Sequence, residues 1–269
     1  MTIRKALTIA GSDTSGGAGI QADLKTFQER DVYGMTALTT IVTMDPDNGW
    51  SHGVHPIPLA TVQEQLHTVL DGIGIDAVKT GMLGSVELIE LVSETIRSRK
   101  LPNVVVDPVM ICKGNDEALH PETGSAMREL LLPVTDIVTP NLFEAAQLSG
   151  RPPIATLDDM KEAAKLIHET GVRYVLIKGG AKLEYPTAVD LLYDGSSYEL
   201  FEEDRLTTGY THGAGCTYSA AIAAELAKGA SIREAVGTAK AFITKAIQYG
   251  FPINRFVGPT LHSAYRHHA

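Results

Sequence analysis

The sequence predicts an α/β fold in which helices cover both faces of one mainly parallel sheet. Short β-rich runs alternate along the chain with segments of helical period. Several of these runs, such as 104–106 and 174–177, are continuously apolar, as expected for strands that are covered on both faces. Together these patterns predict a three-layer α/β/α sandwich.

The individual elements follow from the same patterns. A first buried strand is expected at 6–10, followed by a glycine-rich loop at 11–19 and a helix that begins near Ile20. The Ala-rich segment 217–228 has strong helix propensity and stops at Gly229. The further strands are expected at 36–44, 77–80, 103–107, 136–139, 173–178 and 189–193, and the helices near 62–70, 86–98, 157–169, 217–228 and 232–249.

Composition limits the classes of function. With 269 residues and no Pro/Ser-rich linker or charge block, the chain is expected to form a single domain over residues 1–269. A formal net charge of −9 argues against binding of nucleic acid through charge alone. We find no membrane-spanning stretch and no signal-peptide pattern, so we expect a cytoplasmic protein. Cys112 and Cys216 lie far apart without metal-ligand or redox spacing, so reduced thiols are expected.

The segment 211–216 is the main candidate for a binding site. Gly213 and Gly215 allow the backbone to approach a bound group closely, and the predicted helix begins directly behind them. The unpaired N–H groups at a helix N-terminus and the positive end of its dipole favour a phosphate or another anion. The alternative is a turn of small residues before a core helix.

Polar residues also follow the predicted strands where each strand ends. Asp107 ends one strand, Asn141 follows the next with Glu144 one turn into a helix, and Lys178 ends another. Because ligands of such sheets collect at the carboxyl ends of the strands, we expect one rim that also includes Asp13 and Asp23. Two carboxylates with an asparagine suit Mg2+, which usually bridges substrate phosphates.

The glycines near the N-terminus allow a rival interpretation. Residues 17–22 fit the dinucleotide fingerprint, and Asp45 could bind a ribose. In that fingerprint the first glycine follows the strand directly, whereas residues 11–16 intervene here, which disfavours a nicotinamide-dependent dehydrogenase. No Gly-Lys-Ser/Thr follows these glycines, so a Walker loop is absent as well.

With these pieces in place, the chain resembles the hydroxymethylpyrimidine kinase and pyridoxal kinase branch of the ribokinase-like superfamily over nearly its whole length. Six motifs carry the resemblance: Ala-Gly-Ser-Asp at 10–13 with Ser-Gly-Gly-Ala-Gly-Ile-Gln-Ala-Asp at 15–23, Lys-Thr-Gly-Met-Leu at 79–83, Val-Asp-Pro-Val-Met at 106–110, Thr-Pro-Asn-Leu-Phe-Glu-Ala at 139–145, Lys-Gly-Gly at 178–180 and His-Gly-Ala-Gly-Cys at 212–216. It implies a ribokinase-like fold, commonly a homodimer, that phosphorylates a hydroxymethyl group with ATP and Mg2+.

The resemblance also implies roles for particular residues. Asp107 and Glu144 would hold Mg2+, directly or through water. Around the transferred phosphoryl group, Gly213, Ala214, Gly215 and Cys216 would form an anion hole. ATP would be bound by Thr139, Asn141, Lys178, Gly179, Gly180, Gly213 and Lys240, and the ring substrate by Gly11, Asp23, Met44, Met82, Val109, Cys112 and Lys113.

Three positions depart from the wider pattern or refine it. Many ribokinase-like kinases have an aspartate base where this chain has Cys216, for which we expect a depressed pKa and a role as proton acceptor. Met44 replaces a glutamine that is usual in hydroxymethylpyrimidine kinases, and a thioether cannot donate a hydrogen bond. Together with Cys216, Cys112 resembles the dual-cysteine pyridoxal kinases. We expect it to add reversibly to the aldehyde of pyridoxal, with Lys113 lowering its pKa and neutralising phosphate charge.

These considerations favour phosphorylation of pyridoxal to pyridoxal 5′-phosphate. Hydroxymethylpyrimidine, or its phosphate, is the second candidate substrate, as in thiamine biosynthesis. A protein that binds pyridoxal without turnover is a different class, which the intact set of Asp107, Glu144 and 213–216 disfavours.

Overall fold

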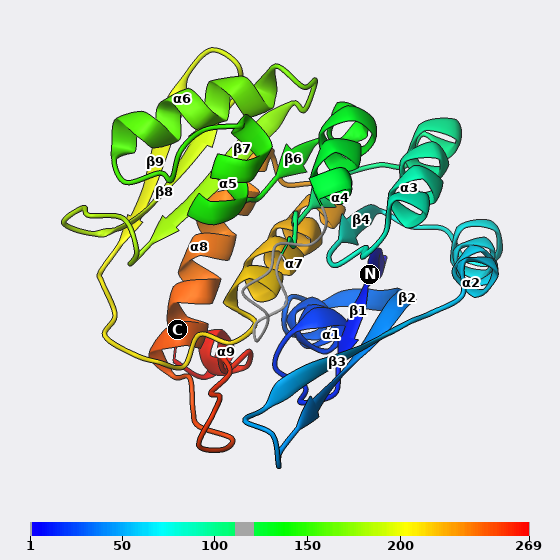
Figure 1. Ribbon diagram of the computed structural model, residues 1–269, viewed down its shortest axis with the longest axis horizontal. Helices are drawn as coiled ribbons and strands as arrows, with labels where there is room; N and C mark the ends of the chain where they lie inside the picture. Colours follow the sequence, from blue (N-terminus) through cyan, green and yellow to red (C-terminus); the bar gives the residue numbers. More distant parts are fainter. Residues whose placement is uncertain (1, 111–120, 269) are drawn as a thin grey trace.

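The computed structural model describes residues 2–110 and 121–268. A nine-stranded sheet runs through them in the order β3-β2-β1-β4-β5-β6-β7-β8-β9 (Figure 1). The strands are β1 (Arg4–Asp13), β2 (Val32–Asp45), β3 (Ser51–Pro56), β4 (Ala77–Thr80), β5 (Val104–Val106), β6 (Ile137–Val138), β7 (Tyr174–Gly180), β8 (Ala188–Tyr193) and β9 (Tyr198–Glu203).

The centre of the sheet is parallel and its two edges are antiparallel. The run from β2 to β7 pairs in parallel throughout. By contrast, β3 joins β2, β8 joins β7 and β9 joins β8 in antiparallel register. The predicted fold class, a mainly parallel sheet within an α/β/α sandwich, is confirmed.

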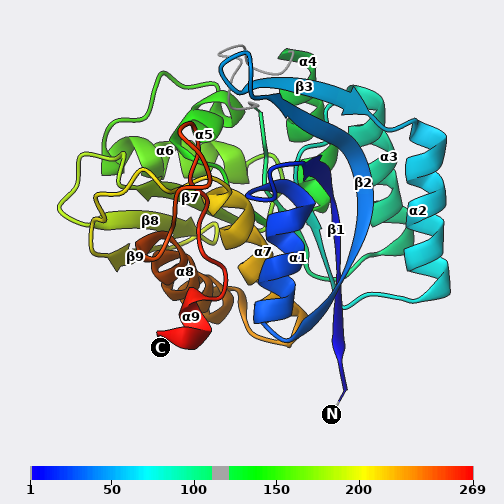
Figure 2. The same cartoon turned by 90° about the horizontal axis from the view of Figure 1, so that it is seen from below.

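Helices pack on both faces of this sheet. The helical segments are α1 (Gly19–Glu29), α2 (Leu59–Gly72), α3 (Val86–Arg99), α4 (Pro121–Ala126), the π-turn η1 (Met127–Leu131), the 3-10 turn η2 (Leu132–Val134), α5 (Leu142–Ser149), α6 (Leu157–His168), α7 (Ala214–Ala227), α8 (Ile232–Gln248) and α9 (Ala264–His267). Figures 1 and 2 show α1, α7 and α8 side by side on one face, with α2 to α6 on the other.

The two faces hold two separate hydrophobic cores. Strand side chains alternate between them, so Val104 and Val106 join the core under α2 to α6, whereas Val105 joins the core under α1, α7 and α8. Helix α7 contributes mostly buried alanines to the second core. Their small side chains let α7 lie close to the sheet and between α1 and α8, which brings its N-terminus to the carboxyl ends of the strands.

The elements that the sequence did not predict lie mostly at the periphery. Both β3 and β9 were missed because their residues are half-buried or exposed and carry no regular apolar pattern. Strand β1 also continues to Asp13, three residues into the predicted glycine loop. Among residues 2–110 and 121–268, none of the helices combines the length and apolarity that a bilayer crossing requires.

Candidate active site

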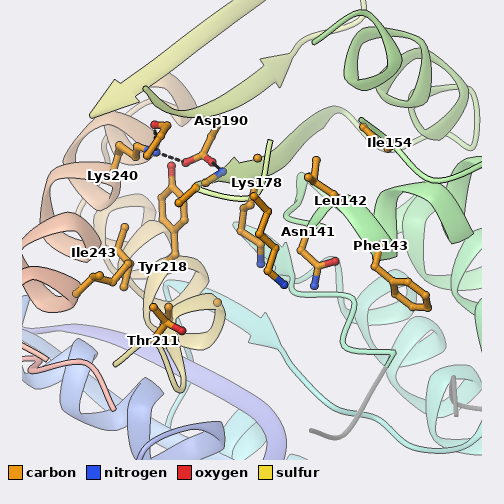
Figure 3. Close-up of a pocket in the computed structure, with 18 of the residues that line it drawn as sticks. Asn141, Leu142, Phe143, Ile154, Lys178, Asp190, Thr211, Tyr218, Lys240 and Ile243 are labelled. Atoms are coloured by element: carbon orange, nitrogen blue, oxygen red, sulfur yellow. Dashed lines mark hydrogen bonds and ion pairs between the residues drawn. The ribbon is translucent and has the colours of Figure 1, made fainter. Parts of the chain in front are cut away.

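Two cavities adjoin at the carboxyl ends of the parallel strands. The larger, about 650 Å³, lies between α5, β7, β8, α7 and α8 (Figure 3). The smaller, about 230 Å³, lies between the ends of β1, β2 and β4 and the segment 211–216. Five residues line both cavities and so mark their junction: Asn141, Lys178, Thr211, Ala214 and Gly215.

The N-terminus of α7 reaches this junction through a glycine turn. Gly213 is the N-cap and has a φ of +76°, a left-handed conformation that favours glycine. A Cβ there would stand 1.8 Å from the carbonyl oxygen of Gly17, so no other residue fits without displacing a loop. The predicted anion hole at 213–216 therefore lies at the meeting point of the cavities, with the start of a helix aimed at it.

Lys178 and Asp107 form an ion pair beside this turn. Lys178 Nζ lies 2.9 Å from Asp107 Oδ1, and Ser219 Oγ donates to Asp107 Oδ2 at 3.3 Å. Burial alone would raise the pKa of Asp107, but the charges of Lys178 and Lys79 outweigh it and lower the pKa. The Asp107 carboxylate is therefore ionised at neutral pH.

Glu144, on α5, lines the smaller cavity. Its side chain accepts a hydrogen bond from the backbone of Asn141 at 2.8 Å, and Asn141 Oδ1 accepts one from the Glu144 backbone at 2.9 Å. This capping box fixes both residues at the start of the helix. Burial raises the pKa of Glu144 to about 7, and the charge of Asp107 adds to this effect against the opposing charge of Lys178.

These two carboxylates fit a magnesium ion. Both line the smaller cavity, where burial and then the charge of Asp107 raise the pKa of Glu144, so a cation beside them would stabilise its ionised form. Among the described residues, no group of three or more His, Cys, Asp or Glu side chains could hold a metal. Mg2+ needs no such group, because one or two carboxylates usually suffice when phosphates and waters complete its shell.

The larger cavity contains most of the predicted ATP-binding residues. Asn141, Lys178, Gly179, Gly180 and Lys240 all line it. Figure 3 shows Lys240 paired with Asp190 at one end, where Lys240 Nζ lies 2.7 Å from Asp190 Oδ2.

Thr139 requires a correction. It is fully buried and lines neither cavity, and its hydroxyl lies 3.4 Å from both the Val106 carbonyl and Asp107 Oδ1. Thr139 directly follows β6, which ends at Val138, and its hydroxyl packs against the Asp107 carboxylate.

Four predicted substrate-binding residues line the smaller cavity, namely Gly11, Met44, Met82 and Val109. Asp23 does not, and its predicted hydrogen bond to a ring substrate is wrong in this structure. The Asp23 side chain is fully buried, where Lys79 Nζ lies 2.8 and 2.9 Å from its two carboxylate oxygens and Thr8 Oγ1 donates at 2.6 Å. Lys79 and Thr8 therefore engage the Asp23 carboxylate, and no part of it is exposed to a ligand in the cavity.

Cys216 lines the smaller cavity but lacks the expected acidity. Burial raises the pKa of its thiol to about 11, and the charges of Asp23 and Asp107 add to this although Lys79 opposes them. The prediction of a depressed pKa is therefore wrong for the site without ligands, because burial outweighs the positive charge of Lys79 and the hydrogen bond with the Gly19 backbone. Cys112 and Lys113 lie outside the described residues, so their predicted roles stay predictions.

The structure adds cavity residues to which the sequence gave no individual role, although Lys79 and His212 belong to the quoted motifs. Lys79, His52 and His212 line the smaller cavity, and Asp190 and Tyr218 line the larger. His52 stands opposite Met44 on the antiparallel partner strand. Only the motif at 79–83 gave a signal for Lys79, and the missed strand β3 concealed His52.

A helix N-terminus and a lysine at the junction of two cavities, with two carboxylates beside them, define an α/β phosphotransferase that acts on a small molecule. The chain belongs to the phosphomethylpyrimidine kinase family, whose model matches residues 13–261. The resemblance inferred from the six motifs, and the expectation of a kinase, are thereby confirmed.

Individual relatives cover almost the whole chain. A pyridoxine kinase of Bacillus subtilis is 61% identical over 99% of this chain and 98% of its own length. A hydroxymethylpyrimidine/phosphomethylpyrimidine kinase of the same organism is 44% identical over 99% of this chain and 97% of its own.

Solved structures agree. An ADP complex of Bacillus subtilis pyridoxal kinase superposes with a TM-score of 0.96 at 61% identity, covering 98% of this chain and 99% of that one. Staphylococcus aureus pyridoxal kinase in complex with AMP-PCP and pyridoxal gives a TM-score of 0.93 at 50% identity, covering 99% and 96%.

Proposed function

We propose that this kinase transfers the γ-phosphoryl group of ATP to the 5′-hydroxymethyl group of pyridoxal and forms pyridoxal 5′-phosphate. The observation that carries the proposal is the junction of the two cavities at Asn141, Lys178, Ala214 and Gly215. The larger cavity suits a nucleotide and the smaller one a single substituted ring. Similarity to a structure that contains AMP-PCP and pyridoxal supports this assignment.

The residues at the junction act by positioning and by charge. Phosphoryl transfer leaves little covalent chemistry to the protein, so alignment and charge stabilisation provide most of the acceleration. Lys178 brings a positive charge to the point where both substrates meet, and the first turn of α7 offers backbone N–H groups there. Asp107 and Glu144 would hold Mg2+, which supplies further positive charge to the phosphate oxygens when it is bound.

The substrate hydroxyl must lose its proton during the transfer, and Cys216 is the predicted acceptor of that proton. Cys216 lines the smaller cavity, yet a thiol with a pKa of about 11 is protonated at neutral pH. In a loose phosphoryl transfer the hydroxyl gives up its proton late, so a strong base is not required. Cys216 therefore serves mainly as a wall of the cavity beside the reacting hydroxyl.

Hydroxymethylpyrimidine is a second candidate substrate. The family description and the relatives at 44% identity favour it. Met44, which lines the smaller cavity, argues for pyridoxal first, because a thioether cannot donate and accepts only weakly. We propose the pyrimidine as a slower, additional substrate.

The cytoplasmic location, the homodimer and the single domain over 1–269 stay predictions. The charge of −9 gives no reason to add nucleic acid to the small-molecule partners.

A substrate panel tests the proposal. The purified protein with ATP and Mg2+ is assayed for ADP formation with pyridoxal, pyridoxine, pyridoxamine and hydroxymethylpyrimidine, and the phosphorylated products are identified by mass spectrometry. We expect the highest kcat/KM for pyridoxal. A preference for hydroxymethylpyrimidine over all three vitamers would move the enzyme to thiamine biosynthesis. Absence of ADP formation with every acceptor, despite binding of pyridoxal, would leave a binding protein.

A further inference from the structure

Three chain segments that are distant in sequence contact one another beside the smaller cavity. They are the glycine loop 13–19 after β1, the segment 211–213 before α7, and the segment 258–260. His212 binds the last of these through its backbone, since its N–H donates to the Gly258 carbonyl at 3.1 Å and its carbonyl accepts from Thr260 at 3.3 Å. The first two segments both line the cavity, through Ala18 and Gly19 and through His212 and Gly213.

Asp13 joins these segments. Its side chain accepts three hydrogen bonds, from the backbone N–H of Ser15 and of Ala18 at 2.8 Å each and from His212 Nε2 at 2.7 Å. Burial alone would raise the pKa of Asp13, but the hydrogen bonds from His212 and Ser15 outweigh it and hold the pKa far below its usual range. The ionised carboxylate can only accept, so Nε2 of His212 carries the hydrogen.

The backbone packs tightly around Asp13 and His212. A Cβ on Gly17 would stand 2.4 Å from Cδ2 of His212, and a Cβ on Gly213 would stand 1.8 Å from the Gly17 carbonyl oxygen. The glycine loop and the turn before α7 are therefore in direct contact, and a shift of one displaces the other. Asp13 and His212 are 5% and 9% exposed, so water does not replace their hydrogen bond readily.

We propose that Asp13 is a positioning residue for phosphoryl transfer: through His212 it fixes the N-terminus of α7 against the wall of the smaller cavity. The same carboxylate shapes the loop that forms that wall. The alignment of the acceptor hydroxyl with the phosphoryl group at 213–216 thus depends on one buried side chain. Asp13 lines the smaller cavity, but both of its carboxylate oxygens are engaged by protein hydrogen bonds. The role rests on the proposed function, because it concerns the alignment of acceptor and donor.

The substitution Asp13→Asn tests this role with little change in volume. The asparagine NH2 must face either Ser15 N–H or the pair of Ala18 N–H and His212, so one donor always meets another donor. We expect kcat to fall by about 100-fold, the scale for a displacement of about 1 Å, while the KM for ATP stays within about threefold. The matched control is Thr26→Val, which removes a fully buried hydroxyl hydrogen bond on the adjacent helix α1. It should lower stability without lowering kcat.

A second pair of variants changes His212, the partner of Asp13 in this hydrogen bond. His212→Ala removes the donor, whereas His212→Gln retains an N–H donor. We expect the glutamine variant to keep at least about tenfold more kcat than the alanine variant, and Asp13→Asn to add little further loss to His212→Ala. Full additivity of the two losses would overturn the proposal, as would equal rates for the two His212 variants.

Hydrogen exchange of the protein without ligands separates this proposal from the proposed function. In Asp13→Asn, amides of the peptide 211–217 should exchange about tenfold faster than in the wild type, and in Thr26→Val they should not. If the wild-type protein phosphorylates no acceptor, the proposed function fails while the exchange comparison still decides the role of Asp13. If Asp13→Asn matches Thr26→Val in kcat and in exchange, Asp13 is a structural residue only.

Discussion

Lys79 Nζ lies within hydrogen-bonding distance of both carboxylate oxygens of Asp23, and both side chains are completely buried. Asp23 belongs to α1 and Lys79 to β4, so the pair links the helix to the sheet next to the smaller cavity, which Lys79 lines. Burial of a charge is costly unless it is paired, and Thr8 supplies Asp23 with a further hydrogen bond. The acid that the sequence assigned to substrate thus belongs to the support of the site.

We expect Asp23→Asn and Lys79→Met each to lower the free energy of unfolding by about 3–5 kcal/mol, because each leaves an uncompensated buried charge or donor. Urea denaturation measures this. The double variant Asp23→Leu/Lys79→Met removes both charges and should be more stable than either single variant. If Asp23→Asn instead has the same free energy of unfolding as the wild type and a raised KM for pyridoxal, Asp23 binds the substrate directly.

Asp23 also shows where prediction from sequence ends. Asp107, Asn141 and Lys178 could be placed together because each follows an apolar run, and the ends of parallel strands share one edge. The position of Asp23 depends on which face of α1 meets the sheet, and a lysine 56 residues away decides its partner. The contact of Asp13 with His212 joins residues 199 positions apart, which no local pattern encodes.

The two carboxylates of the smaller cavity provide a prediction on metal dependence. Glu144→Gln and Asp107→Asn each remove a negative charge from the proposed magnesium site, so we expect turnover to fall by at least about 100-fold, within the range for loss of one charge-stabilising group. Initial rates measured against Mg2+ concentration should show a raised requirement for the ion. Glu94→Gln, on the exposed side of α3, serves as the control. Unchanged rates in both site variants would remove the metal assignment.

Position 44 provides a prediction on substrate choice. We expect Met44→Gln to shift the ratio of kcat/KM values toward hydroxymethylpyrimidine over pyridoxal by about tenfold, which corresponds to about one net hydrogen bond of 1.4 kcal/mol. The ratio is measured with both acceptors at saturating ATP. A constant ratio would show that residue 44, although it lines the smaller cavity, does not distinguish the two rings.

The raised pKa of Cys216 provides a prediction on reactivity. With a pKa of about 11 the thiol is almost entirely protonated at pH 8, so alkylation by iodoacetamide should be slower than for a free cysteine by at least about tenfold. The measurement uses a Cys112→Ala background, which leaves Cys216 as the remaining cysteine. For the same reason Cys216→Ala should retain more than about a tenth of kcat. Rapid alkylation with a large loss of kcat would reinstate Cys216 as the proton acceptor.

His262 provides a prediction on pH. It is 7% exposed, and its Nε2 lies 3.0 Å from Thr217 Oγ1 in the first turns of α7. Burial, together with the charge of Lys25, lowers the pKa of His262 from 6.5 to about 4. Between these values the unfolded chain binds a proton that the folded protein excludes, so stability is lost as the pH falls from about 6.5 through 4.

The loss attributable to His262 should approach about 3 kcal/mol at pH 4, from 1.36 kcal/mol per pKa unit. His262→Gln keeps a hydrogen-bonding group but has no proton to gain, so the free energy of unfolding should decline by about 2 kcal/mol less between pH 7 and 4.5 than in the wild type. Urea denaturation at a series of pH values measures this decline, and His67→Gln, whose side chain is 76% exposed on α2, is the control. Equal declines in the wild type and in His262→Gln would show that His262 already binds its proton in the folded state.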